Sequence, residues 1–387
     1  MSYAYIVGTY DTKGDELRYV KQILASAGLA ARLIDVSTKA SEQSRNVDVD
    51  VSARTIATYH PEGANAIYGV TDRGEAVAAM AIAFQMYVRQ HKDEISGLIG
   101  LGGSCNTALV APGMRELPIG TPKFMVSTVA SGNIAPYVGS NDIAMIYSVV
   151  DVAGLNSISR KVLGNAANAL AGTLRFPLPD AGERELPAVG LTMFGVTTPC
   201  VDHIVDQLKD RHECFVFHAT GVGGKTMEKL VDSGRLVGVI DVTTTEVADL
   251  LMGGVMSAGE GRLDAIARTR IPYVGSCGAL DMVNFGAMEG VPAQYKQRKL
   301  LAHNPQVTLM RTTQDENRRM GEWIAKKLNA CEGEVRFFIP LKGVSMLDVE
   351  GQMFHDPEAD AALFAALEAT LVQSPRRQLI KLPYAIN

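Results

Sequence analysis

Short hydrophobic runs alternate with longer stretches of helical periodicity over the first 174 residues. The runs have the length and the β-branched content of buried strands, and the stretches between them repeat apolar residues with a period close to 3.6. The predicted strands are 4–8, 31–36, 97–100 and 123–127, and the predicted helices are 14–27, 72–91 and 157–174. Strands that alternate with helices are typical of an α/β domain with a mainly parallel sheet.

The alternation stops at residues 175–187, which contain three prolines and a Gly-Glu-Arg-Glu run. Such a break in composition predicts a linker. Strands and helices then alternate again, with predicted strands at 188–193, 213–218 and 237–241 and predicted helices at 199–211 and 226–232. We therefore expect an N-terminal α/β domain over 1–174, a linker over 175–187 and a C-terminal α/β domain over 188–387.

Composition fits a globular protein, since 47% of the 387 residues are hydrophobic and 20% are charged. A net charge of -5 provides no overall basic field for nucleic acid or an anionic membrane. No apolar run is long enough to span a bilayer, and the first residues enter a strand without a signal-peptide pattern. The five cysteines include no Cys-x-x-Cys pair, so reduced thiols and a cytoplasmic location are expected.

Two glycine-rich turns, at residues 100–107 and 218–225, each follow a predicted strand and precede a helix-like stretch. Glycines let backbone N–H groups converge, and a helix dipole favours negative charge at its start, so each turn predicts an anion cradle. The alternative is an ordinary tight turn in which glycine supplies a positive φ. Neither turn has Walker A spacing. The first turn contributes the candidate phosphate-binding residues Gly102, Gly103, Ser104 and Thr107.

Two more segments fall at strand ends in the first domain. Ligands of open parallel sheets bind at the carboxyl ends of the strands. Hydroxyl groups and one lysine suit phosphate, and the carboxylate of Asp11 could hold a divalent metal. A helix cap by Thr12 or Asp11 is the alternative. The candidates from these segments are Gly8, Thr9, Asp11, Thr12, Lys13, Ser127, Thr128 and Gly132.

The second domain has its own polar strand ends. His218, Glu246 and Asp281 each follow a predicted strand, and strand ends of one parallel sheet share an edge, so the three side chains could converge as a catalytic acid/base and metal site. Residues 243–245, three consecutive threonines, are also typical of a helix N-cap region. A structural role as caps and buried hydrogen bonds therefore stays open for this group.

Several motifs occur together in a fixed order along nearly the whole chain. They are Gly8-Thr-Tyr-Asp-Thr-Lys-Gly14, Gly100-Leu-Gly-Gly-Ser104, Val126-Ser-Thr-Val-Ala-Ser-Gly132, Phe194-Gly-Val-Thr-Thr-Pro199, Phe217-His-Ala-Thr-Gly221, Asp241-Val-Thr-Thr-Thr-Glu246 and Gly278-Ala-Leu-Asp-Met-Val-Asn-Phe-Gly286. This combination closely resembles a largely uncharacterised bacterial family related to the ATP-binding inhibitor domain of the tomato mosaic virus resistance protein. The resemblance implies two Rossmann-like α/β domains, Mg-ATP binding and a homodimer.

From the motifs and the resemblance together, we expect ATP and Mg²⁺ at the strand ends of the first domain. The alternative position is the 218–224 turn of the second domain. The expected function is an ATP-dependent enzyme that acts on a small acid or sugar in a cleft between the domains. A nucleotide-gated module that controls a partner enzyme, with little turnover of its own, is the alternative. The expected ligands are a nucleotide and a small-molecule substrate, with no nucleic acid and no membrane.

Overall fold

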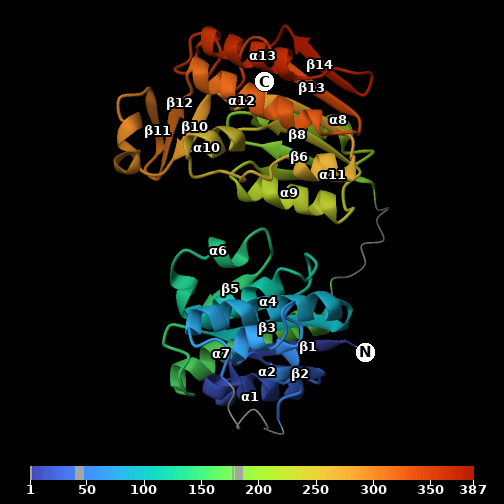
Figure 1. Ribbon diagram of the computed structural model, residues 1–387, viewed down its shortest axis with the longest axis vertical. Helices are drawn as coiled ribbons and strands as arrows, with labels where there is room; N and C mark the ends of the chain where they lie inside the picture. The colour runs from blue at the N-terminus through green and yellow to red at the C-terminus, as the bar shows by residue number, and fades with distance from the viewer. Residues whose placement is uncertain (1, 40–47, 177, 179–185) are drawn as a thin grey trace. The chain divides into compact units, whose positions relative to one another are not determined.

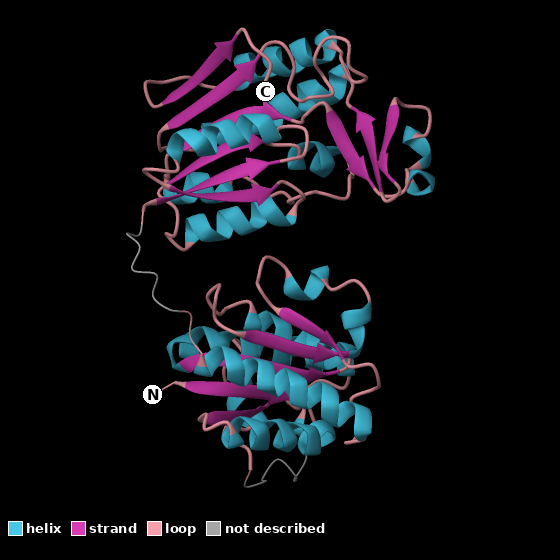
Figure 2. Ribbon diagram, turned by 180° about the vertical axis from the view of Figure 1, so that it is seen from behind, coloured by secondary structure: helices cyan, strands magenta, loops and turns pink. Residues whose placement is uncertain are grey.

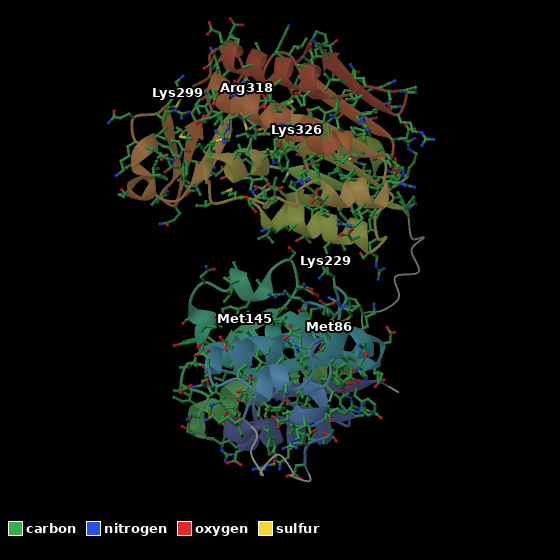
Figure 3. All side chains as sticks on the ribbon, viewed as in Figure 1. Met86, Met145, Lys229, Lys299, Arg318 and Lys326 are labelled. Atoms are coloured by element: carbon green, nitrogen blue, oxygen red, sulfur yellow. The ribbon has the colours of Figure 1, made fainter. Side chains whose placement is uncertain are left out.

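The computed structural model describes residues 2–39, 48–176, 178 and 186–387. The chain divides into two compact units, Met1–Ala181 (unit 1) and Gly182–Asn387 (unit 2). Most of the predicted linker 175–187 lies outside the described residues. Figure 3 draws the side chains of the described residues on the ribbon of each unit.

Unit 1 is built on a five-stranded parallel sheet of order β2-β1-β3-β4-β5. The chain starts at β1, places β2 on one side and then crosses to β3 on the other, so the strand order reverses at β1 and β3. This is the second common order of doubly wound folds, in which ligands bind at the reversal point. The strands are β1 (Tyr3–Gly8), β2 (Ala31–Asp35), β3 (Ile95–Gly102), β4 (Lys123–Ser127) and β5 (Ala144–Tyr147).

Helices cover both faces of the unit 1 sheet (Figure 1). Alternate strand residues point to opposite faces: Ala4 and Ile6 pack with α1 and α7, whereas Tyr5 and Val7 pack with α2, α4 and α5. The α-helices of this unit are α1 (Tyr10–Ser26), α2 (Ala53–Ala57), α3 (Asn65–Tyr68), α4 (Arg73–His91), α5 (Ser104–Met114), α6 (Ala135–Val138) and α7 (Ser157–Arg175).

Unit 2 has a six-stranded parallel sheet of order β14-β13-β9-β8-β6-β7 and a separate antiparallel sheet of order β10-β12-β11 (Figure 2). Taken along the chain, its first five parallel strands repeat the order found in unit 1, with β6 in the place of β1. The strands are β6 (Ala188–Met193), β7 (Glu213–His218), β8 (Gly238–Thr243), β9 (Tyr273–Gly278), β10 (Met282–Phe285), β11 (Leu300–Asn304), β12 (Val307–Arg311), β13 (Val335–Pro340) and β14 (Arg377–Leu382).

The two faces of the larger sheet in unit 2 are covered unequally. Five helices pack with the main hydrophobic core on one face: α9 (Val222–Asp232), α10 (Glu246–Met252), α11 (Asp264–Thr269), α12 (Gln314–Asn329) and α13 (Pro357–Thr370). On the other face, α8 (Thr198–Leu208) is the one helix of the described residues that packs against the sheet, through Val201, and Ile386 lies in the same cluster.

The predicted fold class is confirmed, since both units contain a parallel sheet flanked by helices. Residues 282–285 were not among the predicted strands, but they form β10 and pair with β12. The strand β14 was not predicted, because its arginine, glutamine and lysine interrupt the apolar pattern at this edge of the sheet. Within the described residues, no helix is both long enough and apolar enough to cross a lipid bilayer.

Candidate functional site

The carboxyl edge of the unit 1 sheet gathers the predicted nucleotide-binding residues from three adjacent strands. Strand β1 lies between β2 and β3, and β4 follows β3. The turns after β1, β3 and β4 therefore lie side by side at the reversal point of the sheet. The candidates lie at the ends of these strands, in the turns or in the first turns of the following helices: Gly8, Thr9, Asp11, Thr12 and Lys13 at the junction of β1 and α1, Gly102, Gly103, Ser104 and Thr107 at the junction of β3 and α5, and Ser127, Thr128 and Gly132 at and after the end of β4.

At the start of α1, acceptors from the protein itself already bind the first backbone N–H groups. The backbone N–H of Tyr10 donates to Asp35 Oδ1 at 3.0 Å, and that of Asp11 donates to Ser37 Oγ at 3.2 Å. Asp35 stands at the end of β2 and is 2% exposed, and burial raises the pKa of its carboxyl group above the ordinary range. Neither Thr12 nor Asp11 caps the helix, because Thr9 is the N-cap residue and makes no capping bond with its side chain.

The second helix start, at α5, has free donors. Gly102 has a φ of +151°, and a β-carbon there would lie 2.7 Å from the Cβ of Asn106, so the turn needs glycine. Among the described residues, no acceptor pairs with the backbone N–H groups of Ser104, Cys105 or Asn106. The turn between β3 and α5 thus presents three unpaired amides at the positive end of an eleven-residue helix.

The hydroxyl groups at this edge fall into two classes. Thr107 Oγ1 and Ser127 Oγ are buried and lie 2.6 Å apart, and Ser127 Oγ also accepts the N–H of Val129. This hydrogen bond joins α5 to the end of β4 and so fixes the position of the helix start relative to the sheet. In contrast, Thr12 and Ser104 are exposed, and Thr9 and Thr128 are partly exposed. The exposed hydroxyls are the ones that can reach a ligand.

The metal prediction rests on Asp11, which is partly exposed and accepts a hydrogen bond from Ser37 Oγ at 3.1 Å. Within the described part of the chain, no three His, Cys, Asp or Glu side chains gather where they could hold a metal ion. Mg²⁺ that arrives with a nucleotide needs only one or two carboxylates beside phosphate oxygens and water. The free amides, the hydroxyls, Asp11 and Lys13 therefore fit a Mg-nucleotide better than a free metal ion.

The second glycine turn, before α9, is filled by the protein itself. Glu246 Oε1 accepts the N–H groups of Gly221 at 2.7 Å and Gly224 at 3.0 Å. A β-carbon on Gly224 would lie 2.1 Å from Glu246 Oε2. The carboxylate of Glu246 thus occupies the position that a phosphate would take at this turn.

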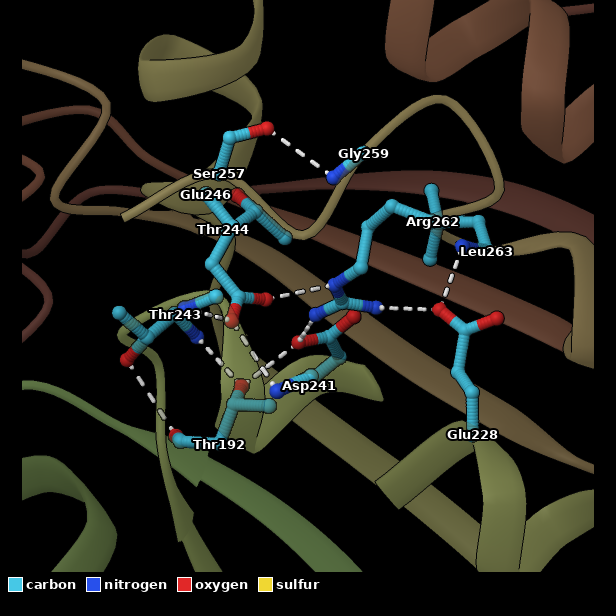
Figure 4. Close-up of polar contacts among 12 residues, drawn as sticks. Thr192, Glu228, Asp241, Thr243, Thr244, Glu246, Ser257, Gly259, Arg262 and Leu263 are labelled. Atoms are coloured by element: carbon cyan, nitrogen blue, oxygen red, sulfur yellow. Dashed lines mark hydrogen bonds and ion pairs between the residues drawn. The ribbon is translucent and has the colours of Figure 1, made fainter. Parts of the chain in front are cut away.

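Glu246 belongs to a buried network around Arg262 (Figure 4). The guanidinium group of Arg262 bonds Glu246 at 2.8 Å, Asp241 at 2.7 Å and Glu228 at 3.2 Å, and its side chain is 1% exposed. The three carboxylates hold the pKa of Arg262 well above its usual value. Asp241 also accepts hydrogen bonds from Thr192 and Tyr273. All the groups around Arg262 are therefore engaged with one another.

Asp281 lies in a second buried network. Its Oδ2 accepts from Ser345 Oγ at 2.8 Å, and burial raises the pKa of its carboxyl group to about 6. Arg311, which is 4% exposed, donates to the neighbouring Asp348 at 3.0 Å and Asp360 at 2.8 Å. Asp281 itself is fully buried.

His218 ends the edge strand β7 and is exposed. The centroid of its ring lies 5.3 Å from the centroid of the Phe194 ring. No hydrogen bond or ion pair of the described residues joins any two of His218, Glu246 and Asp281. The structure thus places these three residues in separate surroundings, and their catalytic role stays a prediction. The contacts of Glu246 and Asp281 are those of the structural alternative.

Four residues with large roles at these edges escaped the sequence analysis, namely Asp35, Ser37, Arg262 and Arg311. Asp35 could have been found, because an acidic residue at the end of the second strand often faces the ligand site of doubly wound folds. Arg262 follows a glycine-rich loop with no periodic signal. Its structural role is evident only from its three carboxylate partners in the folded chain.

Comparison with known proteins gives the chain a family. Residues 2–178 match the N-terminal domain of the Uncharacterised protein family (UPF0261), and residues 186–387 match its C-terminal domain. The chain belongs to the UPF0261 family. This member is 54% identical to the UPF0261 protein of Mesorhizobium japonicum, over 100% of this chain and 96% of that protein. It is 45% identical to a UPF0261 protein of Clostridium tetani, over 99% of this chain and 94% of that protein.

The same UPF0261 chain is 43% identical to the ToMV resistance protein Tm-1(GCR237) of Solanum lycopersicum. That match covers 99% of this chain and 53% of the tomato protein. The resemblance found in the motifs is therefore confirmed, and it covers both units. The family description itself names no activity.

Proposed function

We propose that the chain binds Mg-ATP at the carboxyl edge of unit 1. The observation that carries this proposal is the start of α5, where the amides of Ser104, Cys105 and Asn106 have no acceptor among the described residues. Amides that converge at a helix start, beside a reversal of strand order, favour a phosphate chain. In this proposal the α5 turn binds phosphate, and Asp11 binds the Mg²⁺.

Lys13 supports the proposal because it provides the positive charge that a triphosphate requires. Its backbone departs from helical geometry, with a φ of -130° and a ψ of 19°, one turn into α1. Its side chain is partly exposed, and no carboxylate of the described residues pairs with it. A lysine without an internal partner at this edge remains available to a ligand.

We further propose that ATP serves an enzymatic reaction on a small acid or sugar. A second candidate is a nucleotide-gated module that controls a partner enzyme. The burial of Glu246 and Asp281 in internal networks favours the second candidate, because these side chains were the predicted catalytic groups. A screen of phosphate release with small acids and sugars separates the two, since a gating module would release little phosphate with any of them. A homodimeric state and a cytoplasmic location complete the proposal.

The test of nucleotide binding is the thermal midpoint of unfolding with and without millimolar Mg-ATP. A ligand that binds only the folded state stabilises it by about 2.7 kcal/mol at one hundred times its Kd. Lys13→Ala should weaken ATP binding by roughly 1.5–3 kcal/mol, the value of a charge-assisted contact. Lys225→Ala, at the second glycine turn, is the matched control and should leave binding unchanged. An unmoved midpoint would remove the proposal, and the reverse mutant pattern would transfer the nucleotide to unit 2.

A further inference from the structure

The less covered face of the large unit 2 sheet contains a cavity of about 270 Å³. Its floor is formed by side chains of β8, β9 and β13 that point away from the main core, including Ile240, Val274 and Phe338. One wall is α8, which contributes Cys200 and Ile204. The remaining wall is the segment after β14, through Ile386. The cavity therefore lies between one helix, the sheet and residues 385–386.

The lining of this cavity has almost no polar group to offer. Ser276 is the one lining residue with a hydroxyl, and its Oγ already donates to the carbonyl of Phe338 at 2.9 Å. Burial raises the pKa of the Cys200 thiol, so that group is uncharged at neutral pH. A buried water needs two to four polar partners. The cavity therefore suits neither ordered water nor a charged ligand.

Hydrogen bonds fix the wall that is formed by residues 385–387. Asn387 accepts the N–H of Cys200 at 3.3 Å and donates to the carbonyl of Val196 at 2.9 Å. The N–H of Ile386 donates to the carbonyl of Gly343 at 3.0 Å. These bonds tie residues 386–387 to the start of α8 and to the loop after β13. The segment could not make room for a helix of another protein without losing them.

We propose that this cavity binds a small nonpolar molecule, or the nonpolar part of a larger one, of the size of one aromatic ring or a short aliphatic chain. A cavity of about 150 Å³ lined by Leu, Ile and Phe binds benzene, and this one is larger. Its lining of Ile, Val, Phe and Leu side chains supplies dispersion contacts and no hydrogen-bond partner. The proposal is independent of nucleotide binding, because the cavity is formed by unit 2 residues alone.

Toluene is the probe, and calorimetric titration of the full-length chain is the measurement. We expect saturable binding of toluene and at least tenfold weaker binding of phenol, which has the same ring but a hydroxyl that the lining cannot satisfy. Val274→Phe places a ring in the cavity and should weaken toluene binding at least tenfold. Val216→Phe is the matched control, since Val216 is exposed on the edge strand β7 and does not line the cavity. That variant should bind toluene as the unmodified chain does.

A second measurement keeps the proposal testable if Val274→Phe fails to fold. In a Cys105→Ser, Cys214→Ser background, toluene should slow the reaction of Cys200 with methyl methanethiosulfonate at least threefold. The other two thiols, Cys277 and Cys331, are buried. The absence of toluene binding, or equal binding by the two phenylalanine variants, would overturn the proposal. So would a drop in mass by light scattering in Val274→Phe alone, because it would assign this face to a second copy of the chain.

Discussion

The carboxyl edges of the two parallel sheets contain similar residue types and use them in opposite ways. In unit 1, Asp11, Lys13 and Ser104 are at least partly exposed and leave charge or donors unpaired within the described residues. In unit 2, Asp241 and Glu246 are buried and bound to Arg262. Accessible strand-end groups can meet a ligand, whereas buried and paired ones contribute to the fold. The comparison teaches that polar side chains at a strand end are candidate ligand-binding groups only where no other residue of the chain pairs with them.

The two glycine turns sharpen this contrast, because they are not equivalent in the topology. The turn at Gly102 follows β3, an interior strand of its sheet, whereas the turn at Gly221 follows β7, an edge strand. The similar sequences of the two turns therefore reflect the same local need for glycine. They do not indicate that the two units arose from one duplicated unit. The strand order 2-1-3-4-5, which both units share, is a better sign of a distant relation.

The largest effect should come from removing Arg262, the cation that pairs with Glu246 at the second glycine turn. Arg262→Met would leave Asp241, Glu246 and Glu228 buried without their counter-charge, which costs about 3–5 kcal/mol of unfolding free energy. Urea denaturation measures the loss. Arg268→Met is the control, because its pair with Asp232 is exposed, and exposed pairs contribute about 0–1 kcal/mol. Equal losses in the two variants would contradict the structural role assigned to the Arg262 network.

A smaller effect concerns pH, since the buried acids of unit 2 include Asp249. Burial raises the pKa of its carboxyl group from 3.8 to about 7. Between about pH 4 and pH 7 the folded state keeps a proton that the unfolded state has released, so stability falls as pH rises through this window and levels off above it. Asp249→Asn removes this contribution, roughly 2–4 kcal/mol across the window.

Denaturation of the unmodified chain and of Asp249→Asn at pH 4.5, 6 and 7.5 provides the comparison. Burial also raises the pKa of the carboxyl groups of Asp281 and Asp348, to about 6 and about 9. These two acids are present both in the unmodified chain and in the Asp249→Asn variant. Only the difference between the two profiles therefore reports on Asp249. Parallel profiles would show that its carboxyl group ionises freely in the folded chain.

The next test gives the first turn the carboxylate that the second turn already has. Ser104→Asp places a negative charge beside the unpaired amides of α5, where it should stabilise the helix start by about 0.3–1 kcal/mol. The same charge should weaken Mg-ATP binding by roughly 1.5–3 kcal/mol, the value of a charge-assisted contact. Val222→Asp, at the start of α9, is the matched control and should leave nucleotide binding unchanged. Unaltered ATP affinity in Ser104→Asp would move the phosphates away from α5.

The smallest effect is expected at His218. Its side chain is exposed and at the sheet edge, so His218→Asn should change stability by no more than about 0.5 kcal/mol, as surface substitutions usually do. If His218 nevertheless acts as an acid or base, turnover of the true substrate should fall by about 10²–10⁴-fold. Melting curves and a substrate screen on this variant decide between the two outcomes.

Prediction from the sequence succeeded where the signal is local. The strand over residues 123–127 and the glycine turn at Gly102 follow from apolar runs and from conformational demands within a few residues. The shared edge of the unit 1 candidates followed from the rule that parallel strands end together. The strand β10 was not found, because its residues become a strand only through pairing with β12, about 25 residues later.

By itself, the sequence determined the fold class, the two-part pattern of strands and helices and the family, because each depends on periodicity or on motif order. The tertiary structure alone decided which polar residues are available. Glu246 and Ser104 both follow predicted strands in the sequence. Only the folded chain brings Arg262 and the second glycine turn to Glu246, and leaves the amides at Ser104 unpaired within the described residues. The reason is that burial and charge pairing depend on residues far apart in the chain, which no local pattern encodes.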